Sequence, residues 1–518
     1  MNIIDLLNIT ESICPDRKAL IFDNNSATYS ELKFEIYCLA NSLRDLGINN
    51  GDRVFYFHTN TDKWIHITFA CSLIGAVMVP VNYRSKKEEL NFLINDSSPK
   101  LIFVGDRYHD LINETIKYGN HNLIKVITLD NTLNNDWKTY KDLILNKKLL
   151  EFKNEDSNEI ALLVYTAGTT GTPKAVILKH SSFCEFALNN LDPADLDHNE
   201  STLLSVPLYH VAGIQTAISG IYSGRTTVIQ AQFESLDWMK LVQNYEINRV
   251  MLVPTMIKQI IDNKNFDNYD FRSLNVITYG AAPMPISVLE ESINKFKDAK
   301  FINAFGQTET AATITALGPE DHDISGTEDE KSRKLKRLTS IGKPLQDIEV
   351  RIVDENGKEA SVHDVGEIVA KGERIMSGYW NNAKATMNAI KNGWLYTGDL
   401  GYRDEDGYIF LAGRAKDFIK RGGEMISPEE IEQILYTHPN VEEVAVIGLP
   451  DIQWGEIVTA VIKCKKDKYL TDDEILAFCN DKLASFKRPE KIIFISELPR
   501  NSMGKILKKD LRDKFSAK

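Results

Sequence analysis

The stretch best suited to chemistry is 165–174, which reads Tyr-Thr-Ala-Gly-Thr-Thr-Gly-Thr-Pro-Lys. Glycines allow a tight turn that points backbone N–H groups at anionic oxygens, threonine hydroxyls add donors, and the lysine adds a positive charge. This composition predicts a loop that holds a polyphosphate. The spacing differs from a Walker loop, because Gly168 and Gly171 are too close together and Ala175, not Ser or Thr, follows Lys174. Taken alone, the segment is also compatible with a plain Gly/Thr turn between two strands.

Strand-like segments precede three turns of small residues and predict that these turns lie at the ends of a sheet. Residues 160–164, Ile-Ala-Leu-Leu-Val, predict a short buried strand, so the loop would leave the end of a sheet, where α/β proteins bind ligands. Residues 276–283 pair a strand with a Gly/Ala turn, which lets a flat ring approach the backbone closely. Residues 301–310 predict another strand that runs into a small polar turn, with Glu309 at its end.

Helical and strand-like patterns alternate along the first part of the chain. Strand-like runs occur at 53–57, 75–82, 101–104, 126–129, 226–229 and 249–254. A helical pattern runs from Ser30, a plausible N-cap, to a stop at Gly47, and another covers residues 64–73. This alternation predicts parallel sheets in α/β layers.

The pattern changes further along. The charged stretch 319–340 predicts a mobile, solvated loop, and residues 348–353, 366–370 and 408–411 predict antiparallel strands. After a boundary at Gly413, a capping sequence at 427–430 opens an α+β unit of about 100 residues. We therefore expect an α/β fold: a large N-terminal domain, 1–413, of layered α/β sheets plus a β-rich subdomain, and a small mobile C-terminal α+β domain, 414–518.

The overall composition is that of an ordinary globular protein. The 518 residues are 43% hydrophobic and 26% charged, with a formal net charge of -12. This acidic balance argues against a nucleic-acid partner and favours a small-molecule substrate. The start lacks a secretory signal pattern, and no apolar run reaches the roughly 18 residues of a transmembrane helix. Six scattered cysteines predict reduced thiols, no bound zinc and a cytoplasmic protein.

Six motifs then occur in the order seen in adenylate-forming enzymes. They are the phosphate loop, Gly280-Ala281-Ala282-Pro283, Ala304-Phe305-Gly306-Gln307-Thr308-Glu309, Tyr396-Thr397-Gly398-Asp399, Gly413-Arg414 with Lys416, and Met503-Gly504-Lys505. Across essentially its whole length the chain resembles an acyl-CoA synthetase, most like fatty acyl-CoA ligases, of the AMP-binding superfamily that includes firefly luciferase and non-ribosomal adenylation domains. The resemblance implies ATP, Mg²⁺ and CoA, and two half-reactions that form first an acyl-AMP and then a thioester.

The resemblance also implies residue roles. The ATP/AMP site would comprise Thr166, Ala167, Gly168, Thr169, Thr170, Gly171, Lys174, Gly280, Ala281, Ala282, Asn303, Ala304, Phe305, Gly306, Gln307, Thr308, Asp399, Arg414 and Lys505. Glu309 with Thr166 would hold Mg²⁺, and Lys505 would be the main adenylation catalyst. Lys416 would be the hinge about which the small domain rotates between half-reactions. Alone, Lys505 would more often belong to a solvated basic face, Asp399 to a turn and Glu309 to a helix N-terminus; the motif order reverses these readings.

Further positions would contact the other substrates. His210, Gly213, Tyr279 and Ala311 would shape the acyl pocket, and Gly422 and Gly423 would let CoA pass. A lone histidine is more often structural, and the resemblance makes a functional role for His210 about as frequent as a structural one. No cation is evident at the pocket positions, which favours an apolar fatty or aryl acid over a dicarboxylate or amino acid.

Several positions depart from the family pattern, and none of them is a charged catalytic group; they are Ala167, Ala175, Phe305, Lys371 and Met503. Two alternatives stay open. One is a free-standing ligase that loads a separate acyl carrier protein. The other is a non-enzymatic nucleotide-binding protein, against which the retention of Lys505, Glu309 and Asp399 speaks.

Overall fold

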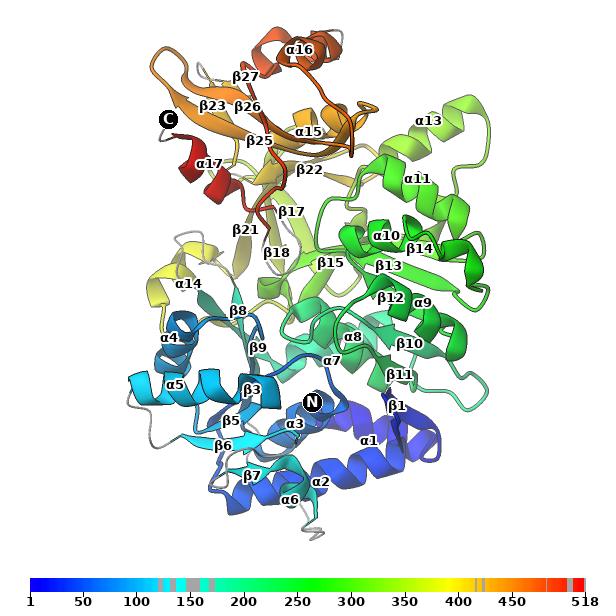
Figure 1. Ribbon diagram of the computed structural model, residues 1–518, viewed down its shortest axis with the longest axis vertical. Helices are drawn as coiled ribbons and strands as arrows, with labels where there is room; N and C mark the ends of the chain where they lie inside the picture. Colours follow the sequence, from blue (N-terminus) through cyan, green and yellow to red (C-terminus); the bar gives the residue numbers. More distant parts are fainter. Residues whose placement is uncertain are drawn as a thin grey trace.

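The computed structural model describes residues 1–119, 124–130, 137–145, 159–166, 173–414, 417–421, 424–480, 482–500 and 506–516 (Figure 1). Within those ranges no helix is both long enough and apolar enough to cross a membrane. The chain forms layered sheets with helices in its first three quarters and a separate sheet with helices near its C-terminus.

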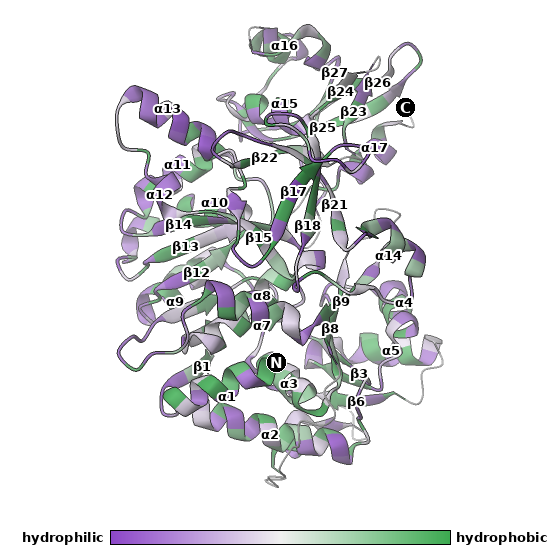
Figure 2. Cartoon of the chain, turned by 180° about the vertical axis from the view of Figure 1, so that it is seen from behind, coloured by the Kyte–Doolittle hydropathy of each residue, from purple (hydrophilic) through white to green (hydrophobic). Residues whose placement is uncertain are grey.

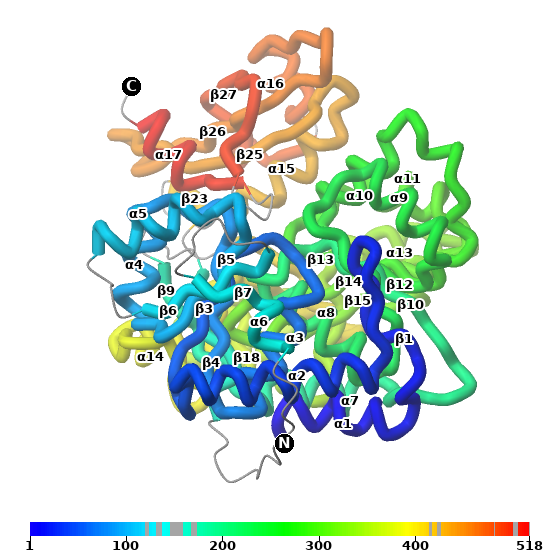
Figure 3. The backbone as a smooth tube through the Cα atoms, turned by 60° about the horizontal axis from the view of Figure 1, so that its bottom comes forward, coloured from blue at the N-terminus to red at the C-terminus, as the bar shows by residue number. Residues whose placement is uncertain are grey.

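A nine-stranded sheet forms one half of the layered region of the described chain. Its strands, in spatial order, are β16 (Lys343–Pro344), β15 (Ala312–Leu317), β14 (Lys300–Gln307), β13 (Val276–Gly280), β12 (Arg249–Leu252), β10 (Ser201–Leu204), β11 (Thr226–Ile229), β1 (Lys18–Phe22) and β2 (Asn25–Thr28). All strands from β14 to β1 run parallel, and antiparallel strands complete both edges. The N-terminal strand β1 thus lies beside β11, some two hundred positions later in the chain (Figure 1). Figure 3 shows the N-terminus at the bottom of the view and the orange and red C-terminal unit at the top.

An eight-stranded sheet forms the other half. Its strands, in order, are β19 (Gly378–Tyr379), β9 (Lys174–Lys179), β8 (Ile160–Thr166), β4 (Val77–Pro80), β3 (Arg53–Phe57), β5 (Leu101–Val104), β6 (Lys125–Thr128) and β7 (Lys138–Thr139). From β8 to β7 every pairing is parallel. The prediction of parallel sheets is therefore confirmed in both halves.

Helices fill the space between the sheets and cover both outer faces (Figure 1). The helices that contribute to the core between the sheets are α1 (Ile3–Ile13), α2 (Tyr29–Asp45), α3 (Asp62–Ile74), α6 (Tyr140–Ile144), α7 (His180–Asn190) and α8 (Val211–Tyr222). The outer helices are α9 (Ser235–Asn244), α10 (Pro254–Ile261) and α11 (Ile286–Lys295) on the nine-stranded sheet, and α4 (Lys87–Ser97) and α5 (His109–Gly119) on the eight-stranded one. Strands buried on both faces read as unbroken apolar runs, which is why β3 was recognisable in sequence.

A third sheet follows, and all its pairings are antiparallel as predicted. Its strands are β17 (Glu349–Val353), β18 (Gly366–Lys371), β21 (Trp394–Arg403), β20 (Ile390–Lys391) and, beside β21, β22 (Ile409–Arg414), with α14 (Ala383–Ala389) before β20. Strands β21 and β22 carry the Asp399 and Arg414 motifs as register partners.

The C-terminal unit has its own sheet and core. Its elements are β23 (Ile419–Arg421), β24 (Glu424–Ile426), α15 (Pro428–Tyr436), β25 (Val441–Asp451), β26 (Gly455–Cys464), α16 (Asp472–Asn480), β27 (Lys491–Phe494) and α17 (Lys508–Ser516). Half of the predicted capping box at 427–430 is present: the Ser427 hydroxyl accepts a hydrogen bond from the Glu430 N–H at 3.4 Å and Pro428 opens the helix, but the Glu430 carboxylate accepts from Lys487 Nζ and not from the Ser427 N–H. The domain boundary at 413/414 remains a prediction.

The interpretation of residues 319–340 as a loop was wrong. They form α12 (Pro319–His322) and α13 (Glu328–Arg337), and α13 stands out as a hydrophilic helix in Figure 2. Thr327 caps α13 in a reciprocal box with Glu330, with acidic residues in its first turn and basic ones in its last, which suits the helix dipole. Charged residues without an apolar stripe can thus still form a helix when the caps are right.

The N-cap of the first predicted helix lies two residues earlier than expected. Thr28, not Ser30, accepts the hydrogen bond from the Glu31 N–H, and the Glu31 side chain returns one to the Thr28 N–H. A Thr-x-x-Glu box satisfies two N–H groups, whereas a cap at Ser30 would satisfy one.

Candidate active site

The described residues form a cleft with a volume of about 2770 Å³. Its wall combines the carboxyl ends of strands in both layered sheets with residues of the third sheet and of the C-terminal unit. The sequence-predicted residues that line it are Thr166, Lys174, His210, Gly280, Ala281, Ala282, Asn303, Ala304, Phe305, Gly306, Gln307, Thr308, Glu309 and Asp399. Segments more than two hundred positions apart in sequence therefore share one cavity.

Some predicted residues lie outside the described ranges. They are Ala167, Gly168, Thr169, Thr170, Gly171, Lys416, Gly422, Gly423 and Lys505, together with the side chain of Arg414. The residues that flank two of these segments are informative. Thr166 and Lys174 pair across β8 and β9, Arg500 and Ile506 form an antiparallel bridge, and all four line the cleft.

The ends of β13 and β14 depend on glycine. A Cβ on Gly280 would lie 2.0 Å from the Ala304 carbonyl oxygen, and one on Gly306 would lie 1.6 Å from that of Ala312. Both distances are far below van der Waals contact, so only glycine fits. Next to them Ala281 adopts a φ of 64°, a left-handed conformation that costs energy for alanine and is typical of functional sites.

Asp399 is fixed by its surroundings. It is 5% exposed, and the side-chain amide of Gln307 donates hydrogen bonds both to its carboxylate and, at 3.0 Å, to the carbonyl oxygen of Thr397. The neighbouring Gly398 N–H donates to Glu367 at 2.9 Å. A carboxylate held this way against the strand ends can accept further hydrogen bonds from a ligand in the cleft.

Glu309 stands beside a tyrosine that the sequence analysis did not single out. The Tyr379 hydroxyl donates a 2.8 Å hydrogen bond to Glu309 Oε1, and Lys174 Nζ lies 5.0 Å from the Tyr379 ring centroid. Both Glu309 and Thr166 line the cleft with oxygen donors, which is the donor type that Mg²⁺ prefers alongside phosphate oxygens. The residues present thus fit a magnesium ion bound together with a polyphosphate.

His210 precedes α8 at the same strand-end level. Burial, reinforced by the positive charge of Arg84, lowers the pKa of His210 to about 3. Its Nε2 has no hydrogen-bond partner within the described chain, and its ring packs 4.2 Å from that of Tyr209. His210 is therefore neutral at pH 7 and presents an uncharged ring to the cleft.

Three predicted acyl-pocket residues are not among those that line the cleft. Tyr279 is fully buried and its hydroxyl hydrogen-bonds to His322 Nε2 at 3.0 Å. Gly213 packs under Pro207, whose carbonyl oxygen a Cβ would meet at 2.4 Å, and Ala311 is fully buried. Their acyl-pocket roles remain predictions; each is the sequence neighbour of a residue that lines the cleft, namely Ala212, Gly280 or Ala312.

The cleft also includes charged residues that were missed. Arg225 and Arg249 line it, although the pocket positions considered in the sequence held no cation. Each stands at the amino end of a strand, β11 or β12, whereas the sequence motifs follow the carboxyl ends of strands. Tyr379 could have been noticed from its place in the Gly378-Tyr379-Trp380 run, but no spacing rule links it to Glu309.

Comparison with known proteins decides the family. The AMP-binding enzyme model matches residues 11–380, and the AMP-binding enzyme C-terminal domain model matches residues 430–505. The chain belongs to the AMP-binding enzyme family.

Relatives of this AMP-binding enzyme match over nearly its full length. A fatty acid–[acyl-carrier-protein] ligase, ScoC, of Streptomyces coeruleorubidus is 31% identical and covers 97% of this chain and 94% of its own. A 2-succinylbenzoate–CoA ligase of Oceanobacillus iheyensis is 32% identical, with 96% and 97% covered. Among solved structures, the o-succinylbenzoate CoA synthetase of Bacillus subtilis with its acyl-adenylate intermediate is 28% identical, with a TM-score of 0.83 and 98% of both chains covered.

Proposed function

We propose that this AMP-binding enzyme is an ATP-dependent carboxylate–CoA ligase. The observation that carries the proposal is the single cleft in which Lys174, Glu309, Gly280, Gly306 and Asp399 meet, in a chain that the two family models match over residues 11–380 and 430–505. Each has a distinct physical use towards one nucleotide: charge and metal binding at the phosphates, a flat face at the base, and an acceptor at the ribose.

In the first half-reaction a carboxylate oxygen of the acid attacks the α-phosphorus of ATP. A bond forms between that oxygen and phosphorus, the bond to pyrophosphate breaks, and acyl-AMP results. Thr166 and Lys174, at the two ends of the phosphate loop, contribute donors and charge to the β- and γ-phosphates, and Mg²⁺ bound through Glu309 would shield the negative charge that gathers there. Lys505 would contact the carboxylate and α-phosphate, a role that the cleft position of Arg500 and Ile506 supports.

In the second half-reaction the CoA sulfur attacks the acyl carbon, and AMP leaves with the carboxylate oxygen it received. The two steps need different groups at one place, so the C-terminal unit turns about Lys416 and brings Gly422 and Gly423 to the cleft. Glycines there leave room for the pantetheine arm of CoA.

A carrier-protein ligase is the second candidate, because the ScoC relative transfers fatty acid to an acyl carrier protein. The chemistry of both half-reactions is unchanged; only the body that carries the phosphopantetheine thiol differs. Assays that offer either free CoA or a carrier protein with a free phosphopantetheine thiol separate the two candidates.

The proposed function is tested by ATP–pyrophosphate exchange across a panel of aliphatic, aryl and amino acids, with CoA thioester measured in parallel. We expect exchange with one acid class and loss of at least a hundredfold in Lys505→Ala. The exposed Lys466→Ala is the matched control and should behave as wild type. Absence of exchange with every acid would contradict the proposal, and exchange without CoA thioester would favour the carrier-protein ligase.

A further inference from the structure

The cleft continues from His210 along one face of α8. Val211, Gln215 and Ser219, four residues apart on that helix, line it, and Thr202 of β10 and Met251 of β12 lie in the opposite wall. We call this part of the cleft the acyl branch, since it leads away from the nucleotide side. Because α8 runs back along parallel strands, the branch passes from their carboxyl ends to their amino ends.

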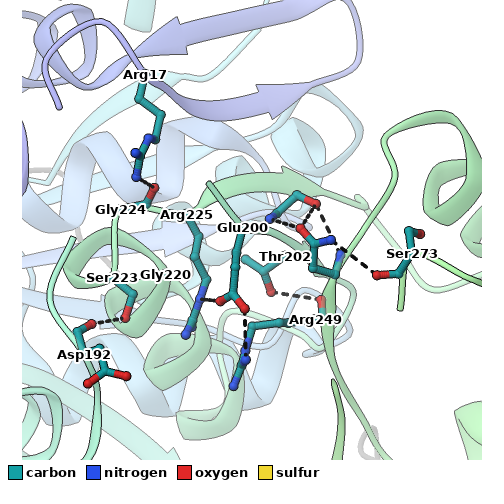
Figure 4. Close-up of polar contacts among 12 residues, drawn as sticks. Arg17, Asp192, Glu200, Thr202, Gly220, Ser223, Gly224, Arg225, Arg249 and Ser273 are labelled. Carbon is teal, nitrogen blue, oxygen red and sulfur yellow. Dashed lines mark hydrogen bonds and ion pairs between the residues drawn. The ribbon is translucent and has the colours of Figure 1, made fainter. Parts of the chain in front are cut away.

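The far end of the acyl branch carries two arginines that share one carboxylate. Arg225 Nε donates to Glu200 at 3.0 Å and Arg249 Nη1 donates to the same carboxylate at 3.2 Å (Figure 4). Both arginines line the cleft, whereas Glu200 is not among its lining residues. The cluster therefore keeps one uncompensated positive charge, and that charge is on the cleft side.

The position of Arg225 is fixed by its backbone. Its N–H donates to the Gly220 carbonyl oxygen at 2.9 Å, and its own carbonyl oxygen accepts a 2.8 Å hydrogen bond from the fully buried Tyr29 hydroxyl. The preceding Gly224 has a φ of 65°, and its carbonyl oxygen accepts from Arg17 at 3.1 Å (Figure 4). Because these contacts fix the backbone of Arg225, the side chain starts from a well-defined position beside the cleft.

Hydrogen-bonding capacity is left unused in this region. Among the described residues, the Nη atoms of Arg225 have no partner, because only its Nε contacts Glu200. Gln215 Oε1 is buried without a partner, while its Nε2 donates to Ser219 at 2.9 Å. Burial, and then the repulsion from Arg249, lowers the pKa of Arg225. An anion placed here would relieve that repulsion and accept hydrogen bonds from the Nη atoms of Arg225, whereas Gln215 Oε1 is itself an acceptor and adds no donor for an anion.

We propose that the far end of the acyl branch is a second anion site, and that the acid substrate carries a second carboxylate at its far end. This inference rests on the proposed ligase function. A methyl-ended tail would remove water from Thr202, Ser219 and the two guanidinium groups without replacing their hydrogen bonds, which is unfavourable. A carboxylate can accept a charge-assisted, two-point hydrogen bond from a guanidinium group.

The length of the branch sets the length of the substrate. The nine residues from His210 to Ser219 advance about 13 Å at the ~1.5 Å rise of an α-helix. With carbon–carbon bonds of ~1.5 Å, a zigzag chain on the order of ten carbons spans that length. Decanedioic acid and decanoic acid are therefore the matched pair of probes, equal in length and different only in the far group.

The experiment compares kcat/KM for the two probes in ATP–pyrophosphate exchange, for wild type, Arg225→Met and Arg249→Met. Each variant leaves the half-buried Glu200 carboxylate one arginine partner. We expect wild type to prefer decanedioic acid at least tenfold and each variant to lose most of that preference while keeping activity with decanoic acid. Arg272→Met, an exposed arginine paired with Asp270, is the matched control and should keep the wild-type ratio.

Two results would overturn the second anion site: wild type using decanoic acid as well as decanedioic acid, or an acid ratio unchanged in both variants. Either result leaves the ligase function intact, because exchange still occurs. Failure of every acid in the wider panel would instead remove the ligase function itself. Thermal unfolding midpoints, measured for each variant, separate a changed preference from lost folding.

Discussion

The parallel strands of the nine-stranded sheet line one cleft with different residue types at their two ends. At the carboxyl ends, Gly280 and Gly306 have no side chains, so that backbone and a few polar groups face the nucleotide side. At the amino ends, Arg225 and Arg249 put long charged side chains at the same cavity. Helix α8 joins the two ends.

The difference shows how each kind of site is encoded. A nucleotide is bound largely by backbone, so its site needs runs of glycine and alanine that stand next to each other in sequence. The tail of an acid is recognised by single side chains, here twenty-four positions apart in the chain. The carboxyl-end site therefore leaves local sequence motifs, whereas the amino-end site depends on single side chains that only the fold brings together.

The largest effect is expected at the carboxyl ends, from Glu309→Gln. The change keeps the shape of the side chain and its contact with Tyr379 but removes the negative charge that would bind Mg²⁺. We expect ATP–pyrophosphate exchange to fall by about a hundredfold to a thousandfold, the cost typical of losing one group that stabilises developing charge. A magnesium titration should show half-maximal activity at a higher concentration, and an unchanged titration would argue against Glu309 as a ligand.

Gly280→Ala should weaken the carboxyl-end site alone. Its new methyl group would meet the Ala304 carbonyl oxygen at 2.0 Å, so β13 and β14 must shift apart where they meet the nucleotide. We expect exchange to fall about tenfold or more, consistent with an overpacking cost of 1–3 kcal/mol, and by the same factor for decanoic and decanedioic acid. Gly407→Asn, at a position with nothing within 4 Å and a residue tolerant of positive φ, is the control. If the loss of exchange activity differed between the two acids, the carboxyl-end and amino-end sites would not act independently.

Tyr379→Phe should have a smaller effect. It removes the 2.8 Å hydrogen bond to Glu309 but neither the carboxylate nor the ring beside Lys174. A hydrogen bond to a charged group contributes about 1.5–3 kcal/mol, so we expect roughly a tenfold rise in the magnesium concentration needed for half-maximal exchange. Full activity at saturating magnesium would mark Tyr379 as a positioning residue, whereas no change in the titration would remove that role.

The smallest effect concerns stability and pH. Because burial lowers the pKa of His210 from 6.5 to about 3, the unfolded chain takes up a proton below pH 6.5 that the folded chain does not. Stability should therefore fall as pH drops from 6.5 towards 3, by up to about 1.4 kcal/mol per pH unit from this histidine. The thermal unfolding midpoint of His210→Asn should drop less than that of wild type between pH 7 and pH 5. His180, whose pKa burial lowers to about 4, retains its own contribution in that variant. Equal drops would show that His210 is not held neutral.

Sequence reasoning predicted the parallel sheets, the antiparallel third sheet and the cap at Ser427, because buried strands and caps leave local patterns. It missed α13, whose helix rests on the Thr327 box and favourable charge order and not on an apolar stripe. It predicted that the residues at the carboxyl ends of the strands share one site, because they belong to short motifs of neighbouring residues. It missed Tyr379, Arg225 and Arg249, because their meeting depends on the fold and no local pattern records it.

The most direct test of the ligase function follows one oxygen atom. The acid that gives the fastest exchange, labelled with oxygen-18 in its carboxylate, is converted with ATP and CoA, and the AMP, pyrophosphate and thioester are analysed by mass spectrometry. Attack of the carboxylate on the α-phosphorus predicts one labelled oxygen in AMP and none in pyrophosphate. Label in pyrophosphate, or AMP without label, would contradict an acyl-adenylate formed in this cleft.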